Sequence, residues 1–185
     1  MISDTVSNAE RRMTKAVEAA QHDYTTIRTG RANPAMLERV NVEIYGTSMP
    51  VNQVATISVP EPRLLLIAPW DKSAISQIER AIQKSDLGLN PSSDGNVIRL
   101  SIPQLTEERR KEFIKLLHKK AEEHRVAVRN VRRDANEELK HQEKAGDASE
   151  DDARRAQEQI QKLTDKYIEQ IDTLTHAKEA ELMEV

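Results

Sequence analysis

The sequence LTEERRKEFIKLLHKKAEEHRVAVRNVRRDANEELK, residues 105–140, decides the fold of this chain. It contains neither Pro nor Gly, and Thr106 stands just before Glu107 and Glu108. A hydroxyl cap followed by acids is typical of a helix start, because the free N–H groups there need acceptors and negative charge. Apolar or small residues recur at steps of three, four and seven, which predicts one buried stripe on a helix roughly 54 Å long. The stripe consists of Phe113, Leu117, Ala121, Val128, Val131, Ala135 and Leu139.

A line of arginines lies beside this stripe. At about 100° of rotation per residue, four positions fall almost on one line: Arg125, Arg129, Arg132 and Asn136. Arg133 lies a little further round, and no acid occurs from residue 124 to residue 133, so we expect these guanidinium groups to lack a local partner before Asp134. The pattern favours phosphate binding, because Arg is suited to bidentate recognition of oxyanions. The alternative is an ordinary solvated helix flank.

Two further long helices are predicted at the ends of the chain. Residues 2–29 carry a heptad-like seam that Gly30 ends, and a third helix follows Gly146 with Ser149 as its cap. The first seam consists of Ile2, Val6, Ala9, Met13, Ala16, Ala20, Tyr24 and Ile27, and the last of Ala156, Ile160, Leu163, Tyr167, Ile171 and Leu174. Three long helices with matching seams predict an antiparallel three-helix bundle.

Residues 31–104 have a different character, since they hold all seven prolines of the chain. Alternating residues predict strands at 40–45 and 97–102, and the apolar run 64–68 predicts a strand buried on both faces. We also expect a turn at 46–50, one or two strands in 51–59 ended by Pro60 and Pro62, and a loop over 85–95. A short helix capped by Asp71 or Ser73 should bury Ile75, Ile78 and Ile82.

The predicted fold class is therefore α+β with two domains. Residues 1–30 and 105–185 form the long antiparallel three-helix bundle, and residues 31–104 form an inserted small β/α/β domain. Two short connections, Thr29–Asn33 and Pro103–Leu105, join the domains. They are interpreted either as a hinge or as a fixed elbow.

Composition limits the function further. The chain has 185 residues, 32% of them charged and 3% aromatic, which suits long amphipathic helices better than a broad core. The absence of Cys excludes disulfides and thiolate chemistry. No secretory signal pattern and no run of about 18 apolar residues occurs. We expect a soluble, cytoplasmic protein without a membrane contact.

The charge is unevenly distributed. Residues 105–140 carry 11 basic and 8 acidic groups, whereas residues 141–185 carry 6 and 12. An otherwise acidic protein therefore has room for one basic face that binds nucleic acid.

No catalytic motif is present. His22, His118, His124, His141 and His176 lack the spacing of a helical metal site. Phosphate-binding glycine loops and nucleophile elbows are missing. We expect no catalytic residue, no metal, no cofactor and no enzymatic activity.

Four stretches of this sequence resemble the bacterial ribosome recycling factor family, and the order of elements matches over essentially the whole chain. Ala148 and Trp70 depart from the expected pattern, in each case without a functional consequence that we can argue. The matching stretches are TIRTGRANP at 26–34, SDLGLNP at 85–91, LTEERRK at 105–111 and RVAVRNVRRDAN at 125–136.

The resemblance implies an L-shaped protein in which a mobile hinge joins the bundle to the β/α/β domain. It implies a monomeric, cytoplasmic factor of translation termination that binds the ribosome along the large-subunit rRNA in the intersubunit space. With elongation factor G and GTP hydrolysis by that partner, such a factor splits the post-termination ribosome into subunits and releases mRNA and tRNA.

The resemblance also implies roles for individual residues. The residues expected to contact rRNA phosphates are Arg28, Arg31, Arg110, Arg129, Arg132 and Arg133. The residues expected to form the hinge are Thr29, Gly30, Ala32, Asn33, Pro103, Gln104 and Leu105. Two other classes remain open from the residues alone: a coiled-coil adaptor whose seams bind partner helices, and an enzyme.

Overall fold

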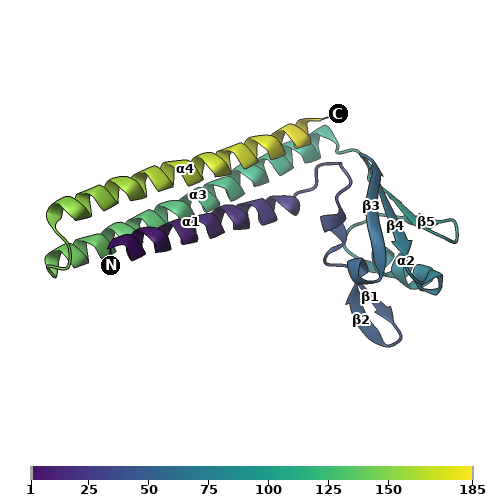
Figure 1. Ribbon diagram of the computed structural model, residues 1–185. Coiled ribbons are helices and arrows are strands. Elements are labelled where there is room, and N and C mark those ends of the chain that lie inside the picture. Colours follow the sequence, from purple (N-terminus) through teal and green to yellow (C-terminus); the bar gives the residue numbers. More distant parts are fainter. Residues whose placement is uncertain (1, 185) are drawn as a thin grey trace. The chain divides into compact units, whose positions relative to one another are not determined.

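The computed structural model describes residues 2–184 of the chain (Figure 1). These residues fall into two compact units. Residues up to 27 and residues 111–184 form the first, called the bundle unit, and residues 28–110 form the second, called the sheet unit. One unit is helical and the other is built mainly on a sheet, so the predicted two-domain α+β fold is confirmed.

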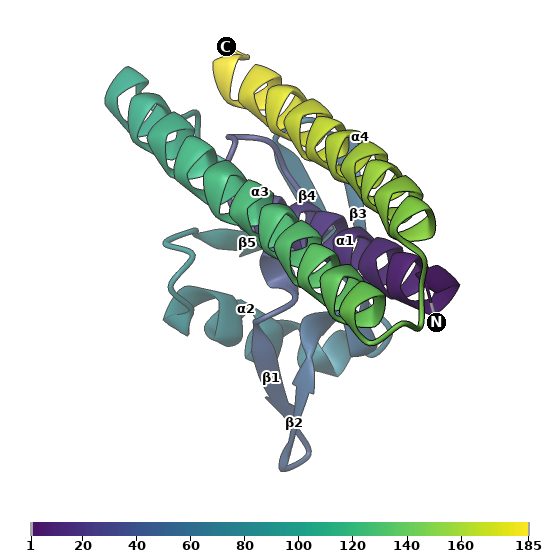
Figure 2. The ribbon, with the colours of Figure 1, turned by 90° about the vertical axis from the view of Figure 1, so that its left-hand side faces the viewer.

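The bundle unit consists of three long helices that lie side by side (Figures 1 and 2). The chain direction of α3 is opposite to that of α1, as predicted, because Thr5 of α1 contacts Gln142 while Asp23 contacts Lys120. It is also opposite to that of α4, because His118 contacts Glu179 while Arg132 contacts Gln161. The helices are α1 (Ile2–Thr25), α3 (Glu107–Lys144) and α4 (Glu150–Met183).

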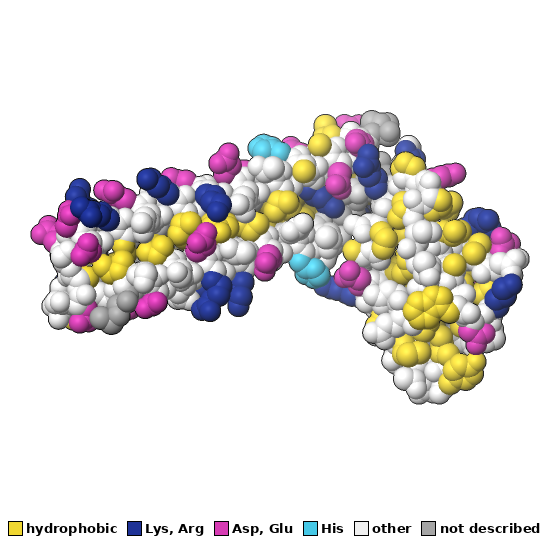
Figure 3. All heavy atoms as spheres, in the orientation of Figure 1, with side chains coloured by type: hydrophobic (Ala, Val, Ile, Leu, Met, Phe, Trp, Pro, Cys, Tyr) yellow, Lys and Arg dark blue, Asp and Glu magenta, His cyan; other side chains and the backbone are white. Residues whose placement is uncertain are grey.

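The core of the bundle contains most of the predicted seam residues, but Leu163 and Leu174 of the predicted α4 seam are only half-buried. Removing an aliphatic side chain from water contributes about 1.5–3 kcal/mol, so these seams provide most of the stability of helices that could not stand alone. On α3, every predicted stripe residue from Leu117 to Leu139 is buried, whereas Phe113 is only half-buried. Figure 3 shows hydrophobic side chains in a line along the bundle, with charged side chains on both sides of it.

Two threonines on α4 are buried in this core, although neither belongs to the predicted seam. Each satisfies its hydroxyl locally: Thr164 donates to the Ile160 carbonyl at 2.8 Å and Thr175 to the Ile171 carbonyl at 2.7 Å. Because the single proton of Thr175 is used in this way, the hydroxyl of Tyr24 must donate across the core to Thr175 Oγ1, at 2.8 Å.

The first helix ends at Thr25, four residues earlier than predicted. The hydroxyls of Thr25 and Thr26 donate to the carbonyls of His22 and Asp23, both at 2.6 Å, and so take up acceptors of the last turn. The backbone N–H groups of Thr26 and Ile27 bond three residues back, which tightens the chain before Gly30. Gly30 itself has a φ of +76°, a conformation that favours glycine.

The caps predicted for the other two helices are confirmed. Thr106 Oγ1 accepts from the Arg109 N–H at 3.2 Å, and Ser149 Oγ accepts from the Asp152 N–H at 3.1 Å. Gly146, with a φ of +79°, separates α3 from α4.

The sheet unit contains a hairpin, a four-stranded antiparallel sheet and one α-helix. The four strands follow the order β3-β4-β6-β5, and the isoleucines of α2 are buried in the same core as the inward residues of β4 and β6. The elements are η1 (Pro34–Leu37), β1 (Asn41–Ile44), β2 (Thr47–Pro50), η2 (Val51–Gln53), β3 (Ala55–Glu61), β4 (Leu64–Pro69), η3 (Lys72–Ala74), α2 (Ile75–Lys84), β5 (Pro91–Ser93) and β6 (Ile98–Ser101). Asp71 caps η3, which leads directly into α2.

Several local predictions for this unit were wrong. The turn expected over 46–50 is only Tyr45–Gly46, with φ values of 50° and 76°, because two successive positive φ angles fit the twist of a two-residue hairpin. In the run 64–68 only Leu65 and Ile67 are buried, whereas the residues of the other face are half-buried, because an antiparallel sheet need not cover both faces equally. The expected loop over 85–95 contains β5, and η2 begins the segment in which strands were expected.

None of the helices formed by residues 2–184 combines the length and the apolar character that a membrane crossing needs.

Candidate RNA-binding surface

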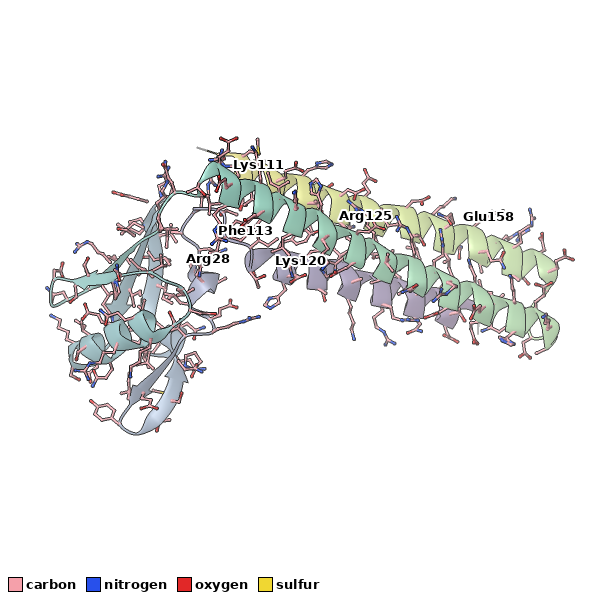
Figure 4. The ribbon with its side chains drawn as sticks, turned by 180° about the vertical axis from the view of Figure 1, so that it is seen from behind. Arg28, Lys111, Phe113, Lys120, Arg125 and Glu158 are labelled. Atoms are coloured by element: carbon pink, nitrogen blue, oxygen red, sulfur yellow. The ribbon has the colours of Figure 1, made fainter. Side chains whose placement is uncertain are left out.

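The arginine line predicted on α3 exists, but its members differ in how they are held. Arg125 lies closest to the core, with its side chain 24% exposed. Its Nε donates to Asp172 Oδ1 of α4 at 2.7 Å, and its Nη1 donates to Glu122 Oε2 at 3.1 Å. Figure 4 shows Arg125 on α3 beside α4. Two carboxylates therefore neutralise Arg125, and its bond to Asp172 connects α3 to α4.

The arginines further along α3 are held by fewer charged partners. Arg129 Nη1 donates to Glu122 Oε1 at 2.8 Å. Among residues 2–184, Arg132 donates only to the neutral amide oxygen of Gln161, from Nη1 at 3.2 Å. Arg133 is exposed and makes no hydrogen bond or ion pair with any of residues 2–184. Positive charge is therefore most available at Arg132 and Arg133, where a phosphate would need to displace no carboxylate.

The expectation that these guanidinium groups lack partners before Asp134 was wrong for Arg125 and Arg129. Glu122 lies three and seven residues before them, within one and two turns on the same side of the helix. Asp172 lies 47 residues away in sequence, and only the packing of α4 against α3 brings it to Arg125. Asp134, the acid expected to end the run, pairs instead with Arg12 of α1 at 2.7 Å.

The other three predicted rRNA contacts belong to the sheet unit. Arg28 is exposed, and its Nη2 donates to the Asp86 carbonyl at 3.2 Å, within the second stretch that carries the family resemblance (Figure 4). Arg31 is exposed, and its backbone N–H contacts Thr29 Oγ1 at 3.4 Å. Arg110 is half-buried, and its Nε is buried without a partner among residues 2–184.

The residues predicted to form the hinge lie on two segments that are close to each other within the sheet unit. A Cβ added to Gly30 would lie 3.6 Å from the Leu105 nitrogen. Ala32 donates its N–H to the Pro62 carbonyl at 2.7 Å, and Asn33 caps the short helix η1. The side-chain oxygen of Gln104 accepts from the guanidinium of Arg63.

A polar cluster near the end of α1 was not predicted from the sequence. Asp23 accepts from Lys120 Nζ at 2.6 Å and contacts His124 Nε2 at 3.0 Å, and the ring of His124 packs edge-on against Tyr24. Burial raises the pKa of Asp23, but the hydrogen bonds and charges of Lys120 and His124 outweigh it and hold that pKa below its ordinary value. Burial in the bundle core raises the pKa of Tyr24 above its ordinary value.

The histidines form no metal site in the described part of the chain. His118 contacts Glu179 at 3.2 Å and His124 contacts Asp23, so each of the two has a single acid beside it. No group of three or more His, Cys, Asp or Glu side chains in residues 2–184 is arranged to hold a metal ion. At the start of α4, Asp151 pairs with Arg154 and Arg155.

A bundle of three long helices and a separate antiparallel sheet unit define the chain as a two-domain α+β protein with an arginine-bearing helical bundle. A sequence profile of the family described as ribosome recycling factor matches residues 20–183. The chain belongs to the ribosome recycling factor family.

Individual relatives match along the whole chain. The ribosome-recycling factor of Halalkalibacterium halodurans is 63% identical over 185 residues and that of Heliobacterium modesticaldum 60%, each alignment covering all of both chains. The chain is also similar to a solution structure of the ribosome recycling factor, with a TM-score of 0.78 and 49% identity over all of this chain and 98% of that one.

A second similar structure is described as a model of the T. thermophilus ribosome recycling factor and the E. coli elongation factor G bound to the E. coli post-termination complex. Its matching chain is 44% identical to this one, with a TM-score of 0.70 and complete coverage of both chains. The predicted family is therefore confirmed.

Proposed function

We propose that this protein recycles ribosomes. It binds the post-termination ribosome and, with elongation factor G and the GTP hydrolysis of that partner, splits it into subunits and so releases mRNA and tRNA. The observation that carries this proposal is the match over the entire length with relatives named ribosome-recycling factor, at 63% and 59% identity for two of them. Similarity to the ribosome-bound factor in the complex with elongation factor G supports the same partners.

Docking on large-subunit rRNA in the intersubunit space uses phosphate contacts in this proposal. Arg129, Arg132 and Arg133 of α3 supply them from the bundle unit, and Arg28, Arg31 and Arg110 supply them from the sheet unit. The graded availability of the three α3 guanidinium groups supports this assignment. Such docking releases counterions and weakens as the salt concentration rises.

The factor itself catalyses no reaction in this proposal and needs no cofactor, because the free energy for splitting comes from the GTP that elongation factor G hydrolyses. It acts as a monomer in the cytoplasm, where ribosomes terminate translation.

A hinge between the two domains transmits the action of elongation factor G. The hinge residues are Thr29, Gly30, Ala32, Asn33, Pro103, Gln104 and Leu105. The proposed domain borders are 30/31 and 104/105, which lie three and six residues inside the sheet unit of residues 28–110. The φ of +76° at Gly30 supports this role, since few other residues adopt that backbone conformation. Because the chain has no Cys, a cross-link between two engineered cysteines, one in each domain, tests the hinge cleanly. It should stop splitting but leave ribosome binding intact, and unchanged splitting would refute the hinge.

Light scattering of post-termination ribosomes mixed with elongation factor G, GTP and this protein tests the function. The unchanged chain should lower the scattering as ribosomes split, and Arg132→Ala should slow that fall. Arg155→Ala is the matched control, because it removes an exposed arginine of α4 that pairs with Asp151 at 2.9 Å, away from the α3 line.

Each outcome separates the competing functions. A fall that survives Arg132→Ala would keep recycling but distribute docking over other residues. No fall with the folded, unchanged chain would refute recycling and favour the coiled-coil adaptor, whose arginines would be incidental. Splitting without elongation factor G would indicate that the chain supplies its own energy source and would favour an enzyme.

A further inference from the structure

Glu122 is an acid that contacts Arg129, one of the predicted phosphate-binding arginines. Its two carboxylate oxygens contact different residues: Oε1 accepts from Arg129 at 2.8 Å and Oε2 accepts from Arg125 at 3.1 Å. An anionic group with two oxygens shared between two guanidinium groups is the arrangement that an RNA phosphate would adopt at the same place. Glu122 therefore occupies, from within the chain, a position that a backbone phosphate could take.

The exposure of these side chains makes the exchange feasible. The side chain of Glu122 is 53% exposed and that of Arg129 is 42% exposed, so water and a phosphate both reach the pair. Hydrogen bonds from Arg129, and then from Arg125, hold the pKa of Glu122 below its ordinary value. Its carboxylate is therefore ionised at any pH at which ribosomes work, and throughout that range it competes with an RNA phosphate for Arg129.

The two arginines would respond differently to losing Glu122. Arg125 keeps Asp172 at 2.7 Å and stays neutralised, because that second carboxylate comes from α4. Arg129 has no second carboxylate among residues 2–184, so its guanidinium would become available. The effect of Glu122 on an incoming phosphate should therefore pass through Arg129.

We propose that Glu122 is an internal stand-in for an RNA phosphate, which weakens ribosome docking by holding Arg129 until a phosphate displaces it. This inference rests on the recycling function proposed above and adds a determinant of its docking strength. A factor that must leave the ribosome after each round benefits from a built-in competitor, because the competitor takes the arginine back when the RNA departs.

Glu122→Gln and Glu123→Gln form a matched pair that tests the proposal. Each removes one negative charge with little change of shape, but the exposed Glu123 makes no hydrogen bond or ion pair with residues 2–184. Binding of the full chain to purified large ribosomal subunits is measured by co-sedimentation at fixed salt. Glu122→Gln should bind about two- to fivefold more tightly, the range of an exposed ion pair, and Glu123→Gln should bind with a clearly smaller gain.

A second comparison assigns the effect to Arg129. In an Arg129→Ala background, Glu122→Gln should gain no more than Glu123→Gln does, because the held guanidinium is gone. Circular dichroism during thermal unfolding shows that each variant is folded before its binding is compared.

The remaining outcomes refute the proposal in distinguishable ways. Equal gains from the two glutamine variants would show that only net charge matters. Weaker binding of Glu122→Gln would show that Glu122 orients Arg129 for the RNA instead of competing with it. Either result would overturn this inference alone. Absence of saturable binding by the unchanged chain would overturn the proposed function, and this inference with it.

Discussion

Arg125 and Arg132 stand seven residues apart on the same line of α3, yet the structure predicts opposite consequences for their removal. Arg125 is held by Asp172 and Glu122, whereas Arg132 is held only by the neutral side chain of Gln161. Arg125→Ala should therefore cost stability and leave RNA docking largely intact. Arg132→Ala should weaken docking and cost little stability.

The magnitudes follow from the contacts. Arg125 is 24% exposed and Asp172 is 41% exposed, so solvent screens the pair and its contribution is about 1 kcal/mol. The packed stem of the arginine adds to this loss, for a total of about 1–2 kcal/mol. A loss of 1 kcal/mol lowers the melting temperature of a domain of about 100 residues, the size of the bundle unit, by roughly 4–8 °C. Arg132→Ala removes one neutral hydrogen bond at the surface and should stay within about 0.5 kcal/mol.

The binding side of the comparison uses salt. Each phosphate contact adds about one to the slope of log affinity against log salt concentration, although the coefficient varies with the nucleic acid. Co-sedimentation with large ribosomal subunits from about 50 to 200 mM KCl should give a slope about one smaller for Arg132→Ala. The slope for Arg125→Ala should equal that of the unchanged chain.

Two results would refute this reasoning. One is a slope that falls equally in both variants, which would make Arg125 a phosphate contact despite its two carboxylates. The other is an equal fall in melting temperature for Arg125→Ala and Arg132→Ala. It would mean that the ion pair of Arg125 with Asp172 contributes no more stability than the contact of Arg132 with Gln161.

Two further predictions concern the cores and turns that support the surface. Tyr24→Phe should lower the free energy of unfolding, measured in urea, by about 1 kcal/mol. Thr175→Val should lower it by more, up to about 3 kcal/mol, because it leaves the buried Tyr24 hydroxyl without an acceptor. Equal losses would contradict the assigned direction of that hydrogen bond. Hydrogen bonds from the Asn96 N–H, the Arg99 guanidinium and the Val97 N–H lower the pKa of Asp94 from 3.8 to about 2. The stability that the Asp94 carboxylate contributes should be complete above pH 3.8 and be lost as the pH falls through about 2. An NMR titration of this carboxyl group with its midpoint near 3.8 would contradict the lowered pKa.

The bundle could be predicted from the sequence because its stripe has one period over a long segment. From Leu117 to Leu139 the buried residues follow the spacing of an α-helix, and no Gly or Pro interrupts it. Gln142 extends the buried face by one further position, where its amide donates to Thr5 Oγ1 at 2.9 Å. A polar residue there gives no hydrophobic signal, so its burial was not predicted.

The errors lie where a few local contacts decide the outcome. The threonines after Asp23 end α1 through their own hydroxyls, which a search for glycine alone overlooks. In the sheet unit, β5 has only three residues and starts with Pro91, so it shows no alternation that could be recognised.

The partners of the arginines divide in the same way. Glu122 lies nearby in the sequence, but it stands just before the acid-free segment 124–133 and was not predicted as a partner. Asp172 could not be assigned to Arg125 without knowing how α3 and α4 pack together. The available charge at Arg132 and Arg133 follows from the sequence, but the neutralised state of Arg125 follows only from the fold.

The two outer strands of the four-stranded sheet each contain a proline, Pro60 in β3 and Pro91 in β5. Proline has no N–H, so at that position each outer strand lacks a backbone donor for pairing with a strand from another molecule. The missing donors therefore disfavour edge-to-edge strand pairing between copies of this chain, the contact through which fibrils grow. Threonine at either position would restore a backbone N–H to that strand and so make this pairing less unfavourable.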